Sequence, residues 1–175
     1  MTAVLAIDRL DLALAGNGGD TLLHRVCLAV AEGEVLGLVG MSGAGKSMLA
    51  KAVLGVLPAA VRITGGSIRV LGQEIVGLDP ERARAGPGRH VALIPQDPLT
   101  ALNPSRRIGA QIMDVMTSRL GMSRAAARER ALALLAEVQI RAPEAVLRRY
   151  PHELSGGQRQ RVLIAAAFAS EPKLI

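Results

Sequence analysis

The glycine-rich segment Gly40-Met41-Ser42-Gly43-Ala44-Gly45-Lys46-Ser47 constrains the fold of this chain more than any other feature. It fits the pattern G-x-x-x-x-G-K-[ST], whose backbone N–H groups wrap the phosphates of a nucleotide. The apolar run from Val35 to Val39 predicts a strand that leads into this segment. The residues after it, Ser47 to Leu54, have helical composition, and Gly55 and Pro58 then end the helix. Strand, glycine loop and helix in this order are the context that the pattern requires.

A second glycine-rich turn, Leu154-Ser155-Gly156-Gly157-Gln158, lies too far along the chain to belong to the same loop. It opens a stretch of helical composition, Gly156 to Ala169. A hydroxyl, bare glycine backbone and a helix N-terminus all suit a terminal phosphate, although the same residues also fit an ordinary N-cap. Two such half-sites in one chain favour ATP held between two subunits.

The first loop has the residue types that a triphosphate with its metal ion needs. Its glycines allow positive φ, so successive N–H groups can point at an anion, and the helix that follows adds about half a positive charge at its N-terminus. Lys46 is expected to reach the β and γ phosphates, and the Ser47 hydroxyl to be a ligand of Mg²⁺.

Gln96 follows a predicted strand, His90 to Ile94, and enters a loop in which its amide can meet Mg²⁺ or orient water. A glutamine after a strand is also ordinary polar surface. We therefore expect ATP and Mg²⁺ as cofactors, with catalytic roles for Lys46 and Gln96 and metal contacts from Ser47 and Gln96. The expected nucleotide contacts are Gly40, Met41, Ser42, Gly43, Ala44, Gly45, Lys46, Ser47 and Met48 in the loop, and Ser155, Gly156, Gly157 and Gln158 in the second turn.

Composition excludes several classes of protein. The chain has 175 residues, half of them apolar, which predicts one domain with room for an inserted lobe. No apolar run approaches the roughly 18 residues that cross a bilayer, and the N-terminus does not resemble a secretory signal, so we expect a cytosolic protein. The net charge of +6 is compatible with a nucleic-acid partner. With one Tyr, one Phe and no Trp, however, the chain lacks the aromatic side chains on which bases stack, and we expect no nucleic-acid partner.

Other residues receive structural interpretations. Cys27 is the single cysteine, and we expect a packed small hydrophobe. The three histidines lack metal-site spacing, and the arginines near the second turn are expected to be helix-face charges, with a docking surface as the alternative. Further strands are predicted at Leu22–Val30, at Ser67–Leu71 and from Lys173. Helices are predicted within Ile108–Val138, where Ser123 would be an N-cap and the buried stripe would consist of Ala127, Leu132, Leu135 and Val138. A short helix is predicted from Pro143.

The first loop, Gln96 within Ile94–Pro98, and the segment Tyr150–Arg161 together resemble the ATP-binding subunits of ABC transporters. The segment Gln96–Pro104 is similar to one typical of the importers for oligopeptides, dipeptides and nickel. The resemblance covers essentially the whole chain. It implies an α/β fold: a P-loop NTPase core with an N-terminal antiparallel β layer and an inserted α-helical subdomain, with the C-terminal strands missing.

The resemblance also implies a division of the chain, which as a whole would be a partial ABC ATP-binding domain. Residues 1–104 would form the β layer and P-loop core, residues 105–154 the helical subdomain, and residues 155–175 the signature helix and the start of the Walker B strand.

In that family, the Walker A loop and the Gln96-type residue of one subunit face the LSGGQ turn of another across a sandwiched ATP. This implies a head-to-tail dimer with an identical or related ATPase subunit, whose ATP binding and hydrolysis power an importer for peptides or nickel. Two membrane permease subunits and, indirectly, an extracytoplasmic substrate-binding protein would be the other partners. The protein would lie peripherally on the cytoplasmic face of the inner membrane.

This sequence departs from the family pattern in three respects. The acidic pair of Walker B should follow Lys173-Leu174-Ile175, so the chain looks truncated before it, and we expect weak ATP binding without useful hydrolysis. The D-loop and the switch histidine are missing as well. The stretch Leu10–Ala15 offers no aromatic for adenine, although Leu14 can supply apolar contact.

Two other functions stay open from the sequence. One is a nucleotide-binding module without catalysis, such as a regulatory remnant or a truncated gene product. The other is a soluble ABC ATPase of DNA repair or translation, against which the Leu102-Asn103-Pro104 segment argues. The transported substrate is not encoded in this chain, because selectivity in such systems lies in other subunits.

Overall fold

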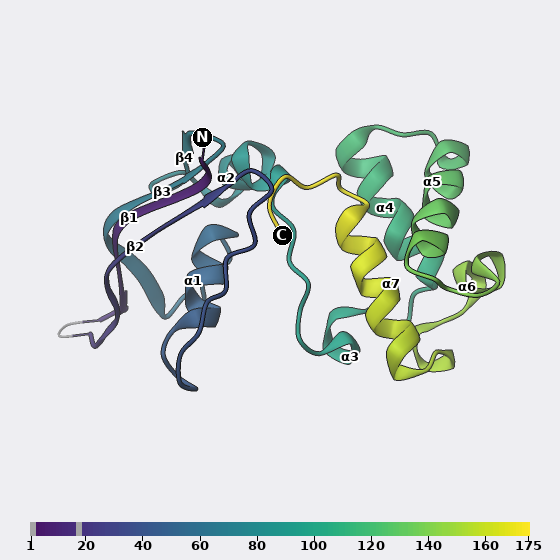
Figure 1. The fold of residues 1–175 in the computed structure, drawn as a ribbon, viewed down its shortest axis with the longest axis horizontal. Coiled ribbons are helices and arrows are strands. Elements are labelled where there is room, and N and C mark those ends of the chain that lie inside the picture. The colour runs from purple at the N-terminus through teal and green to yellow at the C-terminus, as the bar shows by residue number, and fades with distance from the viewer. Residues whose placement is uncertain (1–2, 17–18) are drawn as a thin grey trace. The chain divides into compact units, whose positions relative to one another are not determined.

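A computed structural model describes residues 3–16 and 19–175. The chain forms two compact units: residues up to Val91 together with Leu174, and residues 92–173 together with Ile175 (Figure 1). Each unit has its own hydrophobic core. The functional boundaries expected after residues 104 and 154 differ from this division and stay a prediction.

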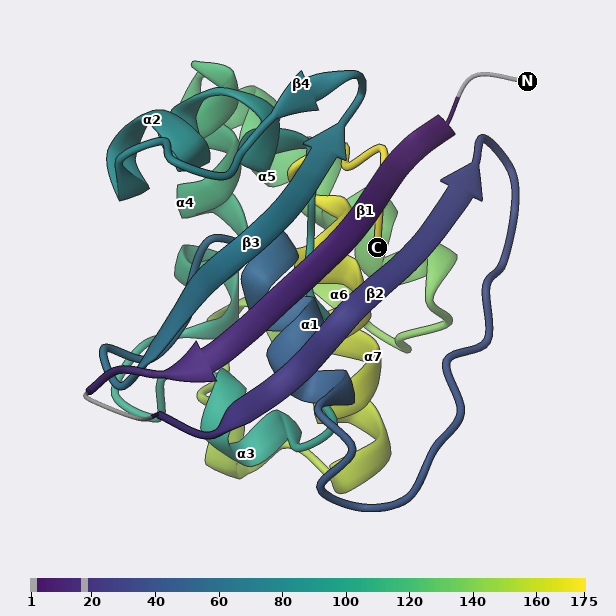
Figure 2. The same cartoon turned by 90° about the vertical axis from the view of Figure 1, so that its left-hand side faces the viewer.

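An antiparallel sheet forms the first unit's outer layer. Its strands run in the order β2-β1-β3-β4 and lie side by side in Figure 2. Every pairing is antiparallel. This confirms the predicted N-terminal antiparallel layer. The strands are β1 (Ala3–Leu14), β2 (Thr21–Ala31), β3 (Val61–Val70) and β4 (Gln73–Glu74).

The sheet buries one face against α1 (Lys46–Val53). Leu10, Leu12 and Ile68 of the sheet are fully buried, and Leu49 and Val53 of the helix belong to the same core. Each such aliphatic side chain contributes about 1.5–3 kcal/mol when it leaves water. This core holds the helix that begins with Lys46 against the sheet. The remaining helices of this unit are α2 (Pro80–Ala85) and the 3₁₀ turn η1 (Pro87–His90).

Cys27 is exposed, so the expectation of a packed thiol is wrong. Its neighbours Val26 and Leu28 pack partly against the core, and successive side chains of a strand point to opposite faces. The Cys27 Sγ accepts a hydrogen bond from the Arg9 N–H at 3.2 Å. On the same strands, Asp11 accepts a hydrogen bond from the Arg25 N–H and contacts His24, and these interactions lower the pKa of its carboxyl.

Two predicted strands are absent from the described part of the chain. Residues 34–40 belong to no helix or strand, and Val35 and Val39 are 96% and 94% exposed. Residues 92–95 are likewise unpaired. An extended apolar segment becomes a strand only when a neighbour pairs with it, and the one parallel pairing among the described residues is the bridge between Val91 and Leu174. The prediction of a strand at Val35–Val39 is therefore wrong for this structure. The prediction of a strand at His90–Ile94 is also wrong, except that Val91 forms a single bridge to Leu174.

The second unit is helical, as predicted for residues 108–138 and beyond. Its core contains the fully buried Ile108, Ile112 and Met116, together with Leu135 and Val162. The helices are α3 (Pro98–Ala101), α4 (Ile108–Leu120), α5 (Arg124–Glu137), α6 (Pro143–Arg148), the 3₁₀ turn η2 (Pro151–Glu153) and α7 (Gly156–Phe168). Within the described residues, no helix is both long and apolar enough to cross a bilayer.

The N-cap prediction for α5 is confirmed, because the Ser123 Oγ accepts a hydrogen bond from the Ala126 N–H. The buried stripe is rotated from the predicted one. Ala127 and Leu135 are fully buried as expected, but Leu132 and Val138 are only partly buried. Ala131 and Leu134 complete the buried face in their place.

Glycine is required at Gly66 of β3, which lies opposite a bulge in β1. Gly66 has a φ of +84°, and a Cβ there would lie 2.3 Å from the Arg9 carbonyl oxygen. We expect Gly66→Ala to lower the free energy of unfolding by at least about 3 kcal/mol, measured by urea denaturation. Gly72→Ala is the matched control, because Gly72 also has positive φ but open space around it, so its cost should be only about 1 kcal/mol. Equal losses in the two variants would contradict this account.

Candidate functional site

The glycine loop enters α1 through a tight contact with β2. Gly45 is the N-cap of α1 and has a φ of +84°. A Cβ on Gly45 would lie 2.5 Å from Leu23 Cδ2 and 3.3 Å from the Leu22 carbonyl oxygen. Gly43 also has a φ of +84°, but a Cβ there would meet nothing within 4 Å. The fold therefore needs glycine at 45 for both conformation and space, whereas Gly43 is needed for conformation alone.

The Lys46 side chain folds back across the loop. Its ammonium donates to the carbonyl oxygens of Gly40 and Met41, both at 2.7 Å. An ammonium group carries three N–H donors, so one remains for a further acceptor. The structure thus brings Lys46 to the two residues that begin the predicted phosphate loop. The loop residues Met41, Ser42 and Ala44 are exposed.

The N-terminus of α1 has no side-chain cap and no acidic residue in its first turn. Its first N–H groups are therefore not satisfied by a side chain, and the positive end of the helix dipole is not neutralised by a carboxylate. Ser47 is exposed in this turn, while Met48 packs partly against the core. Chemically, the loop and this helix end form a cradle for an anion, with Lys46 as its cation and the Ser47 hydroxyl as a hard oxygen ligand.

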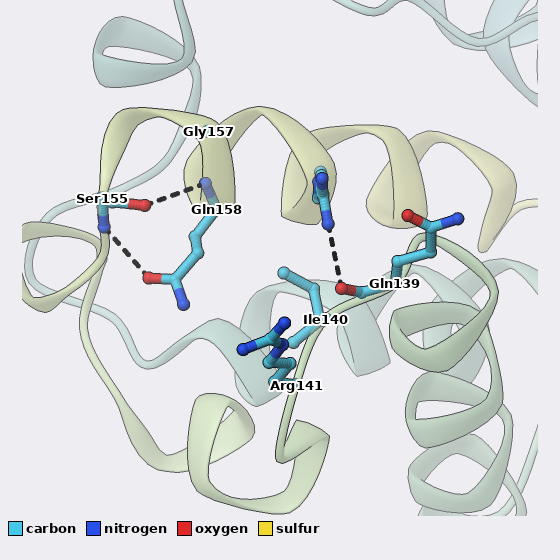
Figure 3. A pocket seen from close by; sticks show the side chains of 7 residues that line it. Gln139, Ile140, Arg141, Ser155, Gly157 and Gln158 are labelled. Carbon is cyan, nitrogen blue, oxygen red and sulfur yellow. Dashed lines mark hydrogen bonds between the residues drawn. The ribbon is translucent and has the colours of Figure 1, made fainter.

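The second turn forms a capping box at the start of α7. The Ser155 Oγ accepts a hydrogen bond from the Gln158 N–H at 3.3 Å, and the Gln158 side-chain oxygen accepts one from the Ser155 N–H at 3.1 Å. Figure 3 shows both bonds. The N-cap interpretation that the sequence left open is therefore correct for Ser155. The Ser155 hydroxyl accepts in this box, so its own O–H stays available to donate.

Gly156 and Gly157 have no steric reason to be glycine in this structure. A Cβ on either would meet nothing within 4 Å, and neither has positive φ. Glycine is less favourable than alanine within a helix, by up to about 1 kcal/mol in its interior, so the fold does not lose stability from a substitution here. Their bare backbone instead leaves the N-terminus of α7 open to close approach by another group.

A hollow of about 350 Å³ adjoins this turn. The loop after α5 lines one side, and the first two turns of α7 line the other (Figure 3). Arg161 Nη1 donates to the Gln139 carbonyl oxygen at 2.9 Å and ties these two sides together. Sequence reasoning missed Gln139, Ile140 and Arg141 as site residues, because neither the positive φ of Gln139 nor its bond to Arg161 can be read from composition.

Two predicted helix-face charges are tied to the backbone. Arg159 Nε donates to the Pro151 carbonyl oxygen at 2.8 Å, and Arg161 makes the bond to Gln139. Both are thus structural ties within the second unit. Of the histidines, His152 stacks on Tyr150 and His24 pairs with Asp11.

Gln96 is exposed in the second unit, immediately before Asp97, which caps α3 through the Leu99 N–H. The structure brings residues 40–48 together in the first unit and residues 155–158 together in the second. The expected approach of Gln96 to Ser47 joins the two units and stays a prediction. Among the described residues, no group of three or more His, Cys, Asp or Glu side chains could hold a metal ion.

Comparisons with known proteins agree on one family. Residues 23–175 match the ABC transporter family. The chain is 46% identical over 174 residues to a probable D,D-dipeptide transport ATP-binding protein, DdpD, of Escherichia coli K12, covering 98% of this chain and 53% of the relative. It is 39% identical to the oligopeptide transport ATP-binding protein OppD of Salmonella typhimurium, with 98% and 51% covered. The chain spans about half the length of the curated relatives it matches.

A solved structure shares the fold. It is a dimeric ATP-binding cassette in a post-hydrolysis state bound to ADP and Pi, with a TM-score of 0.81 and 25% identity over 96% of this chain and 70% of that one. The likeness confirms the P-loop NTPase fold expected from the sequence. The chain belongs to the ABC transporter family.

Proposed function

We propose that this chain belongs to an ATP-binding subunit that powers a transporter for short peptides. The uncapped N-terminus of α1 beside Lys46 is the observation that carries the nucleotide-binding part of this proposal. The relatives described above are a D,D-dipeptide and an oligopeptide transport ATP-binding protein, which favours peptides over nickel as cargo. Two permease subunits, and a substrate-binding protein acting through them, complete the assembly that we propose.

The glycine loop would hold the triphosphate. Backbone N–H groups of residues 40–47 would bind the phosphate oxygens, and the remaining donor of Lys46 would reach the terminal ones. The Ser47 hydroxyl and the Gln96 amide oxygen would be ligands of Mg²⁺, which prefers oxygen donors and neutralises phosphate charge. Ribose and base would lie outside this cradle, where Leu14, 37% exposed at the end of β1, offers only apolar contact.

The second turn would act on the nucleotide of another subunit. We propose a head-to-tail dimer in which Ser155 donates its hydroxyl, and Gly156 and Gly157 present bare backbone, to the phosphates that the partner's loop holds. Support comes from the open space at both glycines and from the dimeric state of the related cassette. ATP would then favour the closed dimer by its differential contacts, and hydrolysis would permit opening. The protein would work peripherally, at the cytoplasmic face of the membrane.

Removal of the Lys46 ammonium tests the loop assignment. Charge-assisted hydrogen bonds contribute about 1.5–3 kcal/mol each, so Lys46→Ala should weaken ATP binding by about ten- to a hundredfold, measured with a fluorescent ATP analogue. Lys51→Ala is the matched control, because it removes the same charge from the last turn of the same helix. Equal affinities of Lys46→Ala and wild type would overturn the assignment.

Gly157→Ala separates folding from function at the second turn. The added methyl group has open space, so the thermal midpoint should stay the same or rise by a few degrees. ATP-dependent dimerisation of the full-length protein should nevertheless weaken by about tenfold or more, because the methyl group blocks close approach to α7. Sedimentation at graded ATP concentrations measures this. Unchanged dimerisation would rule out a contact at this turn.

We predict that residues 1–175 alone hydrolyse ATP only very slowly. A steady-state phosphate-release assay on residues 1–175 checks it, and the expected rate is close to the buffer blank. Brisk turnover that Lys46→Ala abolishes would show that this chain by itself contains a complete catalytic site.

A further inference from the structure

The hollow beside α7 is lined by cationic and neutral polar groups. Arg141 and Arg161 provide two guanidinium groups, Gln139 and Gln158 provide amides, and no lining residue is acidic. Its volume of about 350 Å³ lies in the range of small-ligand sites. An anionic group of nucleotide size suits such a space better than a cation or an apolar ligand.

The loop that carries Arg141 is held in place through the two residues before it. Ile140, immediately before Arg141, is 5% exposed and packs into the core of the second unit. Gln139 and Ala142, on either side of this pair, have positive φ, a conformation that non-glycine residues keep only where the surroundings impose it. The bond from Arg161 to the Gln139 carbonyl imposes it from α7. Arg161 is therefore a positioning residue for this loop.

Three arginines of the second unit are paired with carboxylates, and Arg141 is not one of them. They are Arg106, Arg128 and Arg130. Within the part of the chain that the structure describes, the Arg141 guanidinium has neither an ion pair nor a hydrogen bond, and it lies at the same hollow as Gln158 (Figure 3). Five N–H donors are thus unpaired on a side chain whose backbone is held beside the second turn.

We propose that this hollow is a further part of the nucleotide site and that Arg141 binds a phosphate of the ATP held by the partner's glycine loop. The inference rests on the proposed function, because the hollow shares Ser155, Gly157 and Gln158 with the turn assigned there to the terminal phosphate. A guanidinium presents paired donors that match phosphate oxygens. The second turn alone would offer the partner's ATP a hydroxyl and bare backbone. Arg141 would add a formal positive charge to that contact.

Nucleotide-dependent dimerisation of the full-length protein tests this. We expect Arg141→Gln to raise the ATP concentration for half-maximal dimerisation by about tenfold, and Arg141→Lys to restore part of the loss. Arg148→Gln is the matched control, because Arg148 is an exposed arginine of the same unit outside the hollow, and it should change nothing. The difference between wild type and Arg141→Gln should shrink when salt is raised to about 0.5 M.

The possible outcomes separate the inference from the function on which it rests. If Lys46→Ala abolishes ATP-dependent dimerisation but Arg141→Gln behaves as wild type, the proposed function stands and Arg141 is a solvated surface charge. If Arg141→Gln weakens self-association equally with and without ATP, the hollow receives a carboxylate of the partner protein and the inference is wrong. If Lys46→Ala binds ATP normally, the proposed function itself fails.

Discussion

The close approach of Gly45 to the start of β2 is the constraint on which the first unit's site depends. It places the N-terminus of α1 directly against the antiparallel layer, where a side chain at position 45 would have to displace Leu23. The helix is held there by the core that Leu49 and Val53 share with the sheet. Because neither a side-chain cap nor an acidic residue covers that helix end, its positive end stays available to an anion.

The N-terminus of α7, at the second turn, differs from that of α1 in being capped. Its helix end is capped by its own Ser155 and Gln158, so the two backbone donors that they satisfy, the N–H groups of Gln158 and Ser155, are not available to a ligand. What remains is the Ser155 O–H, the other first-turn N–H groups and the bare surface of two glycines. A capped helix end of this kind is rigid and accessible, but it lacks a lysine. That difference supports a division of labour in which the first loop binds the nucleotide and the second turn completes the site in another subunit.

Local sequence patterns predicted the features that depend on local chemistry. The loop, α1, the capped helix at Ser155 and the N-cap at Ser123 follow from short motifs whose hydrogen bonds form within a few residues. Local patterns could not decide whether Val35–Val39 forms a strand, because a strand forms only when it pairs with a segment that is distant in sequence. The sequence did not predict Arg141 as a site residue, because the position of its loop depends on the burial of Ile140 and on the hydrogen bond from Arg161 of α7 to Gln139.

The central claim is that each chain carries two half-sites for one kind of nucleotide, each completed by another subunit. Amide hydrogen exchange on the full-length protein with its partner subunit, with and without a slowly hydrolysed ATP analogue, tests it most directly. The account predicts that residues 40–47 and residues 155–158 both gain protection, and that they do so only in the dimeric fraction. Protection of the first loop alone in a dimer, or of neither segment, would contradict it.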